Sequence, residues 1–340
     1  MTLINLPNQA ILPLGDPPIN PYRLGASLYM PATRADLWQV ITRQKLPTVN
    51  SLIICLEDAV SAGDVDSALA NVQRLLSEWQ AQAAANLASA GANHRHLNNA
   101  GLDKTAGDRP LVFIRPRHAA MLAQMATWQG IALIDGFVLP KVDMLSLADW
   151  RLAWQQHADG HATPPLVMPT LETAPIFNPH HNHELAQAFI EAFAERVLAL
   201  RIGGNDLLAC LRLRRPRQAT IYATPLGTLI DQLVGCFVPY GFYLTAPVFE
   251  YLDTPELFTQ ELEHDVALGM VGKTVIHPSQ ITAVQQAFAV QARAVADARA
   301  ILAHEAKAVF KQDNAMLEPA THAAWARTIV ARAAVHTVLD

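Results

Sequence analysis

Two acidic side chains, Glu172 and Asp206, follow successive runs of apolar residues, at 166–171 and 197–202. If both runs are parallel strands of one sheet, their carboxyl ends meet at one edge and the two carboxylates face one opening. Two hard oxygen ligands, with the other positions left to water and substrate, suit a Mg²⁺ site. No histidine stands at these two ends, which argues against zinc. The alternative is that either carboxylate caps a helix or pairs with a cation.

Charged side chains also follow three other apolar runs. Arg115 ends a run at 111–114, and its planar guanidinium suits a substrate carboxylate held by two hydrogen bonds. A structural ion pair with Glu57 or Asp58, which follow the run at 51–56, is the rival interpretation. Lys141 follows the run at 136–139 and is a candidate substrate-binding residue.

A glycine pair precedes Asp206. Gly203, Gly204 and Asn205 provide a backbone that can approach a ligand closely, so Gly204 and Asn205 are candidate substrate-binding residues. The segment does not match the glycine-rich phosphate-binding patterns, which makes a nucleotide-phosphate loop a weak interpretation.

These residues depend on short apolar runs that alternate with longer, Ala-rich amphipathic stretches. Such alternation predicts strand-helix units around a buried parallel sheet, and eight units predict a (β/α)8 TIM barrel. The alternative is that polar residues follow the strands only because loops are polar. This would explain one or two of the charged residues at the strand ends. The predicted strands are 24–30, 51–56, 111–114, 136–139, 166–171, 197–202, 241–244 and 273–276.

The chain has 340 residues, of which 51% are hydrophobic, enough for one large core. We expect a barrel over residues 1–281, with a surface insertion near 80–108, where the strand-helix pattern breaks. Residues 282–340 are predicted to form a C-terminal helical arm or lid.

Charge and cysteine content exclude several classes of partner. The net charge is −5, and no long basic run is present, so a nucleic-acid partner is not expected. The cluster Arg212, Arg214, Arg215 and Arg217 is predicted to be a solvated or interface loop. No stretch of about 20 residues is apolar enough to cross a membrane. The three cysteines are predicted to be buried free thiols of a cytoplasmic protein.

Several of these motifs, in this order, resemble the aldolase/citrate lyase superfamily and its citrate lyase β-subunit-like branch. The resemblance covers nearly the whole chain. The matching segments are 27–32 (SLYMPA), 56–60 (LEDAV), 113–115 (FIR), 138–141 (VLPK), 171–174 (LETA), 203–207 (GGNDL) and 272–281 (GKTVIHPSQI).

The resemblance implies a homotrimeric or hexameric barrel that binds Mg²⁺ through Glu172 and Asp206. It implies that Arg115 holds the carboxylate of a 2-oxo acid and that Glu57 and Asp58 organise water beside the metal. The family's reactions are aldol or Claisen-type cleavages and condensations, as in malyl- and citramalyl-coenzyme A lyases. In such lyases a lid aspartate from the neighbouring subunit acts on the acyl carbon, and Glu318 matches its position.

The chain departs from the family's pattern at Cys55, Pro116, Ala246 and Glu318. The leading expectation is a Mg²⁺-dependent carbon-carbon lyase acting on a 2-oxo or hydroxy acid, free or as an acyl-coenzyme A thioester. An acyl-coenzyme A thioesterase in the same site is one alternative. A non-catalytic subunit that binds small acids or supports assembly is the other.

Overall fold

The eight predicted strands form one parallel barrel in the computed structural model, which describes residues 14–89 and 109–340. The strand order is β7-β6-β5-β4-β3-β2-β1-β8, and a parallel bridge between Ala246 and Lys273 joins β7 to β8. The strands are β1 (Gly25–Pro31), β2 (Ser51–Cys55), β3 (Leu111–Arg115), β4 (Gly136–Leu139), β5 (Leu166–Leu171), β6 (Leu200–Ile202), β7 (Leu244–Thr245) and β8 (Gly272–Val275). The predicted (β/α)8 fold is confirmed.

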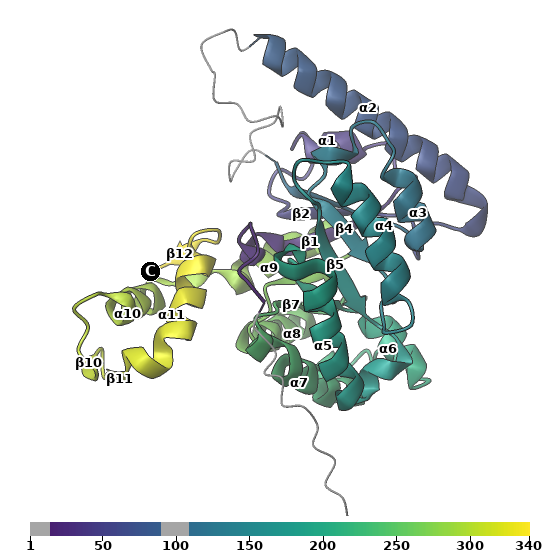
Figure 1. The fold of residues 1–340 in the computed structure, drawn as a ribbon. Coiled ribbons are helices and arrows are strands. Elements are labelled where there is room, and N and C mark those ends of the chain that lie inside the picture. Colours follow the sequence, from purple (N-terminus) through teal and green to yellow (C-terminus); the bar gives the residue numbers. More distant parts are fainter. Residues whose placement is uncertain (1–13, 90–108) are drawn as a thin grey trace, which may run out of the picture.

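Helices surround the barrel and bury the outer face of the strands (Figure 1). Because the strands are covered on both faces, β2 and β3 are buried at every position, which explains their continuous apolar sequences. The helices are α1 (Leu37–Ile41), α2 (Val65–Ser89), α3 (Ala119–Met125), α4 (Leu147–Asp159), α5 (Pro179–Phe193), α6 (Gly204–Cys210), α7 (Pro225–Phe237), α8 (Pro255–Ala267) and α9 (Ile281–Phe288).

The chain beyond α9 is set to one side of the barrel and has a small core of its own (Figure 1). It comprises β9 (Val290–Gln291), α10 (Ala292–Leu302), β10 (Phe310–Gln312), β11 (Ala315–Leu317), α11 (Pro319–Ala333) and β12 (Val338–Leu339). Ile281, Val284 and Phe288 of α9 pack into the barrel core. The division at residue 281 stays a prediction. Hereafter residues 290–339 are called the arm.

The structure corrects two sequence-based expectations. Cys210 is exposed, whereas Cys55 and Cys236 are buried as predicted. Arg215 is not solvated, because its guanidinium is buried and donates to Glu261 Oε2 at 2.5 Å. The Arg215 difference arises from a tertiary contact, which neighbouring residues in the sequence do not indicate, whereas Cys210 is the last residue of α6 and faces solvent.

Part of the predicted insertion near 80–108 belongs to α2, which continues to residue 89, and residues 90–108 lie outside the described residues. Within the described ranges, no helix is both long and apolar enough to span a bilayer.

Candidate active site

Arg115 and Glu172 meet inside the opening of the barrel. Arg115 is the last residue of β3, and Glu172 directly follows β5. Both are buried, and Arg115 Nη2 donates to Glu172 Oε1 at 3.0 Å. The carboxyl ends of these strands therefore bring together two charges that are 57 residues apart in sequence.

The acidic pair after β2 shares the same guanidinium. Arg115 Nη2 lies 2.9 Å from Glu57 Oε2 and 3.4 Å from Asp58 Oδ2. The ion pair named as the rival interpretation of Arg115 is thus present, together with the contact to Glu172. The pKa of Arg115 is raised, because Tyr29, Glu172 and Glu57 outweigh the opposing effect of burial. Arg115 is a permanent cation in this opening.

Lys141 supplies a second cation from the end of β4. Its ammonium contacts Glu57 Oε1, and it lies 3.6 Å from Asp58 Oδ1 and 3.9 Å from Asp206 Oδ1. Its backbone has a φ of 52°, in the left-handed region that a lysine rarely adopts, and its backbone N–H donates to Glu172 Oε1 at 2.8 Å. Strain of this kind persists where surrounding structure imposes it, often at functional sites.

Asp206 stands in the first turn of α6, beside Glu172. Gly203 is the N-cap residue of α6, so Asp206 is not the cap. A Cβ atom on Gly203 would lie 2.4 Å from Glu172 Oε2, which shows how closely this loop approaches the Glu172 carboxylate. The negative charge of Asp206 contributes to raising the pKa of Glu172, as expected for close carboxylates.

The carboxylates of Glu172 and Asp206 are suited to bind one hard divalent cation. Glu172 Oε1 accepts from Arg115 and Lys141, whereas no hydrogen bond from a described residue reaches Glu172 Oε2 or the Asp206 carboxylate. The described ranges contain no group of three or more His, Cys, Asp or Glu side chains arranged for a metal. A two-carboxylate site leaves positions for water and substrate, as Mg²⁺ requires.

Burial gives the site's carboxyl groups unequal proton affinities. Burial raises the pKa of Glu172 to about 7, against the opposing charge of Arg115. Burial also raises the pKa of Glu57. The pKa of Asp58 is lowered, because the hydrogen bond with Glu57 and the charges of Arg115 and Lys141 outweigh burial. Asp58 is therefore the ionised member of the pair.

The remaining predicted residues lie around this centre or apart from it. Gly204 opens α6, and Asn205 Nδ2 donates to Glu250 Oε2 at 3.2 Å rather than to the central carboxylates. Glu318 precedes α11, on the arm. Its contacts are with Thr321 and His322, and no hydrogen bond or ion pair among the described residues joins it to this chain's own opening.

Two residues outside the predicted set of site residues support the site. Arg117 donates through Nε to Leu56 O at 2.8 Å and through Nη2 to Glu57 O at 3.3 Å, so it fixes the backbone that carries the acidic pair. Tyr29 of β1 lies with its ring centroid 5.9 Å from the Arg115 guanidinium carbon. The extra cation two residues after Arg115 is the signal that identifies Arg117.

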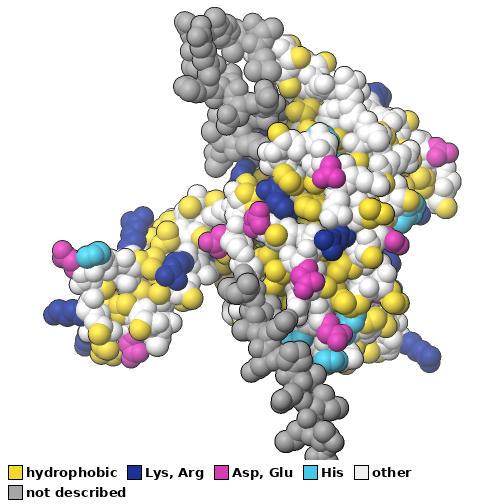
Figure 2. Space-filling view, in the orientation of Figure 1, with side chains coloured by type: hydrophobic (Ala, Val, Ile, Leu, Met, Phe, Trp, Pro, Cys, Tyr) yellow, Lys and Arg dark blue, Asp and Glu magenta, His cyan; other side chains and the backbone are white. Residues whose placement is uncertain are grey.

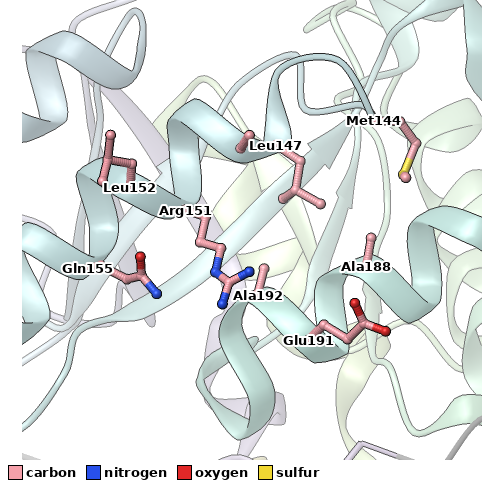
Figure 3. Close-up of a pocket in the computed structure, with 9 residues that line it drawn as sticks. Met144, Leu147, Arg151, Leu152, Gln155, Ala188, Glu191 and Ala192 are labelled. Carbon is pink, nitrogen blue, oxygen red and sulfur yellow. The ribbon is translucent and has the colours of Figure 1, made fainter.

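Two hollows lie near the barrel. One, of about 350 Å³, adjoins the end of β1, and its lining includes Tyr29, Arg34 and Lys45. The other, of about 420 Å³, is a groove between α4 and α5 that includes Met144, Arg151 and Glu191 (Figure 3). None of the predicted site residues lines this outer groove.

Comparisons with known proteins identify a family and several structures of the same fold. Residues 18–338 match the model of a family described as C-C bond lyases of the TIM-barrel fold. A citrate lyase structure from Burkholderia xenovorans LB400 is 18% identical, with a TM-score of 0.69, over 96% of each chain. The CitE protein of Mycobacterium tuberculosis, in complex with magnesium, acetoacetate and coenzyme A, is 20% identical, with a TM-score of 0.59, over 92% of this chain and 99% of that one.

A malate synthase from Haloferax volcanii, in a lead(II) complex, is 15% identical, with a TM-score of 0.56, over 76% of this chain and 71% of that one. Among curated proteins, none matches the chain. At these identities the solved structures share the fold with this chain.

Proposed function

Because the chain belongs to the TIM-barrel family of C-C bond lyases, we propose that it cleaves or forms a carbon-carbon bond next to a carboxylate, with Mg²⁺ held by Glu172 and Asp206. The observation that carries this proposal is the meeting of Glu172, Asp206 and Arg115 in one opening. The structure of the magnesium-bound CitE protein has the same fold and supports the choice of metal.

Each residue has a role in an aldol-type cleavage. Arg115 binds a substrate carboxylate, and Lys141 and Gly204 line the position beside it. Bound Mg²⁺ would polarise the carbonyl of a 2-oxo acid and stabilise the oxyanion that develops when the bond breaks. Asp58, the ionised carboxylate, accepts the proton of the substrate hydroxyl, while Glu57 keeps Asp58 and Lys141 in position.

Cleavage leaves an enolate, whose carbon needs a proton. Among the described residues, the acidic groups beside Arg115 are the site's own carboxylates, the Tyr29 phenol and the Cys55 thiol. Glu318 from a second copy is our candidate for this proton transfer, which requires a homo-oligomer, either a trimer or a hexamer. Within this chain, Glu318 contacts only residues three and four positions further along, Thr321 and His322, among those described. Its carboxylate is therefore available to transfer a proton in a second copy.

The substrate is a 2-oxo or hydroxy acid, free or as a coenzyme A thioester. The hollow beside Tyr29 favours the thioester form, because Arg34 and Lys45 at its wall are cations suited to phosphate groups. Both cations contact Asp36, at 2.8 Å and 3.2 Å, so a phosphate would compete with this carboxylate.

Product analysis separates the lyase from a thioesterase that uses the same site. With malyl-coenzyme A, a lyase yields glyoxylate and acetyl-coenzyme A, whereas hydrolysis yields malate and free coenzyme A. Binding of oxalate or pyruvate without cleavage, across a panel of acids and thioesters, would instead favour the non-catalytic binding subunit.

The proposal is tested with Glu172→Ala, Asp206→Ala and the double variant. Calorimetric titration with Mg²⁺ and a turnover assay should both show loss of function, because each variant removes one of two side-chain ligands. Asp253→Ala is the matched control, since Asp253 is an exposed carboxylate paired with Arg217. A double variant that retains magnesium affinity and turnover would refute the metal centre.

A further inference from the structure

A third arginine, Arg201, lies inside the barrel near Arg115. It is the middle residue of β6, within an otherwise apolar run, and it is 1% exposed. Its side chain contacts residues of three other strands, with Nη2 donating to Thr274 Oγ1 at 2.6 Å and Nη1 lying 3.9 Å from Met168 Sδ. Its guanidinium carbon lies 5.3 Å from the Tyr29 ring centroid. The side chain therefore crosses the barrel interior.

Arg201 differs from the other buried cations in having no carboxylate. Arg115 contacts Glu57 and Glu172. Arg215 and Lys273 share Glu261, and Lys273 also contacts Asp265. No carboxylate among the described residues pairs with Arg201, whose partners are a hydroxyl, a sulfur and an aromatic ring. A buried charge without an opposite charge destabilises the folded protein.

Two threonines whose hydroxyl groups have no hydrogen-bond partner flank Arg201 on the neighbouring strands. Arg201 is in register with Thr170 on one side and Thr245 on the other, so the three side chains project from one face of the sheet. Thr170 Oγ1, Thr245 Oγ1 and Arg201 Nε are buried without a hydrogen-bond partner. Buried polar groups are nearly always satisfied, so unpaired hydroxyl groups beside a cation suit an anionic ligand that accepts hydrogen bonds from both.

Two side chains in contact with Arg201 are accessible to solvent. Thr274 and Tyr29 are partly exposed, although Arg201, Thr170 and Thr245 are buried. The guanidinium carbons of Arg115 and Arg201 lie 5.9 Å and 5.3 Å from the centroid of the same Tyr29 ring. A single short dianion can therefore reach both arginines.

We propose that Arg201, with the hydroxyls of Thr170, Thr245 and Thr274, forms a second carboxylate-binding subsite beneath Arg115. The acid that this chain handles then carries two carboxylates, one held at the opening and the other inside the barrel. That this acid is the substrate rests on the proposed function. Binding of the dianion itself does not require magnesium.

The subsite is tested by calorimetric titration of the full chain with succinate and with butyrate, in buffer containing EDTA. Both ligands have the same carbon skeleton length, and they differ in the second carboxylate. We expect succinate to bind at least about tenfold more tightly to the wild-type protein, as a charge-assisted contact in a buried site gives. Arg201→Met should abolish this preference, and Arg201→Lys should restore part of it.

Two further variants keep the test decisive. Thr245→Val is nearly isosteric and removes a hydroxyl that has no partner, so it should weaken succinate binding without lowering the melting temperature. Arg214→Met removes an exposed arginine side chain and should change nothing. In buffer without carboxylates, Arg201→Met should melt no lower than the wild-type protein, because it removes an unpaired buried charge.

The proposal is overturned if the wild-type protein binds the two acids equally. It is also overturned if Arg201→Met keeps the preference, or if this variant melts well below the wild-type protein, as loss of a purely structural arginine would cause. Preference for succinate that depends on Arg201, in a protein without magnesium binding or turnover, would retain the subsite and reject the lyase function.

Discussion

At the scale of single residues, the protonation of Glu172 affects both the stability of the fold and the proposed binding of the metal. Its folded pKa of about 7 exceeds the ordinary value of 4.5, chiefly because of burial. The stability that Glu172 contributes is thus present below about pH 4.5 and lost as the pH rises through 7. A cation that neutralises the ionised carboxylate should reverse this loss.

The pH dependence of unfolding tests this property. Glu172→Gln mimics the protonated form, so in metal-free urea denaturation it should gain stability over the wild-type protein between about pH 4.5 and 7. The gain should level off above that range and be on the order of 3 kcal/mol, at about 1.4 kcal/mol per pKa unit. In the wild-type protein, magnesium affinity should rise over the same range. A difference between the proteins that does not change with pH would contradict the assignment.

Arg115 joins Glu57 and Glu172, and its loss should be costly. Arg115→Met leaves two buried carboxylates without their cation, which should lower the free energy of unfolding by about 3–5 kcal/mol near pH 7. Arg217→Met is the matched control, because its ion pair with Asp253 is exposed and worth less than about 1 kcal/mol. Urea denaturation measures both values. Equal losses for the two variants would mean that the Arg115 network contributes no more than a surface pair.

At the scale of elements, the loop between β6 and α6 sets the position of Glu172. Gly203→Ala would place its Cβ 2.4 Å from both Cβ and Oε2 of Glu172. The displaced carboxylate should lower magnesium affinity by roughly 10- to 100-fold, the range seen when residues that orient metal ligands are changed. Calorimetric titration with Mg²⁺ measures the loss.

Gly235→Ala is the control for this substitution, because an added Cβ on Gly235 in α7 meets nothing within 4 Å. In a helix, this change should raise stability by about 0.5–1 kcal/mol and leave magnesium affinity unchanged. Normal magnesium affinity in Gly203→Ala would show that Glu172 does not depend on this loop.

The strands were predictable because a barrel buries both faces of its sheet, which leaves continuous apolar runs in the sequence. The meeting of Glu172 and Arg115 followed from the shared direction of the strands. Arg201 and Arg215 are both buried. The sequence did not predict which of them pairs with a carboxylate. Arg215 finds Glu261 on α8, 46 residues away, whereas no described carboxylate pairs with Arg201. Such pairing depends on tertiary contacts, which local patterns do not encode.

At the scale of the whole molecule, the arm presents apolar surface beside the barrel. Exposed large hydrophobic side chains occur along it, and Figure 2 shows hydrophobic atoms on its surface. The side chains concerned are Leu302, Val309, Met316, Trp325, Val330, Val338 and Leu339. The arm is joined to the rest of the chain by few polar contacts, among them Asn20 Nδ2 to Ala331 O and Arg332 Nη2 to Phe288 O. A surface of this kind is suited to a second copy.

Glu318 follows β11, on the part of the arm that projects from the barrel (Figure 1). If it acts on the opening of another copy, Glu318→Ala and Glu172→Ala should each be inactive alone. A mixture of the two should recover part of the wild-type turnover, because mixed oligomers contain an intact opening served by an intact Glu318. Glu172→Ala mixed with Asp206→Ala is the control and should stay inactive, since every opening is then defective. The test measures turnover after co-expression, with light scattering to determine the oligomeric state. An active Glu318→Ala variant would show that Glu318 takes no part in the reaction. A mixture no more active than its components would show that each active site is built from one chain.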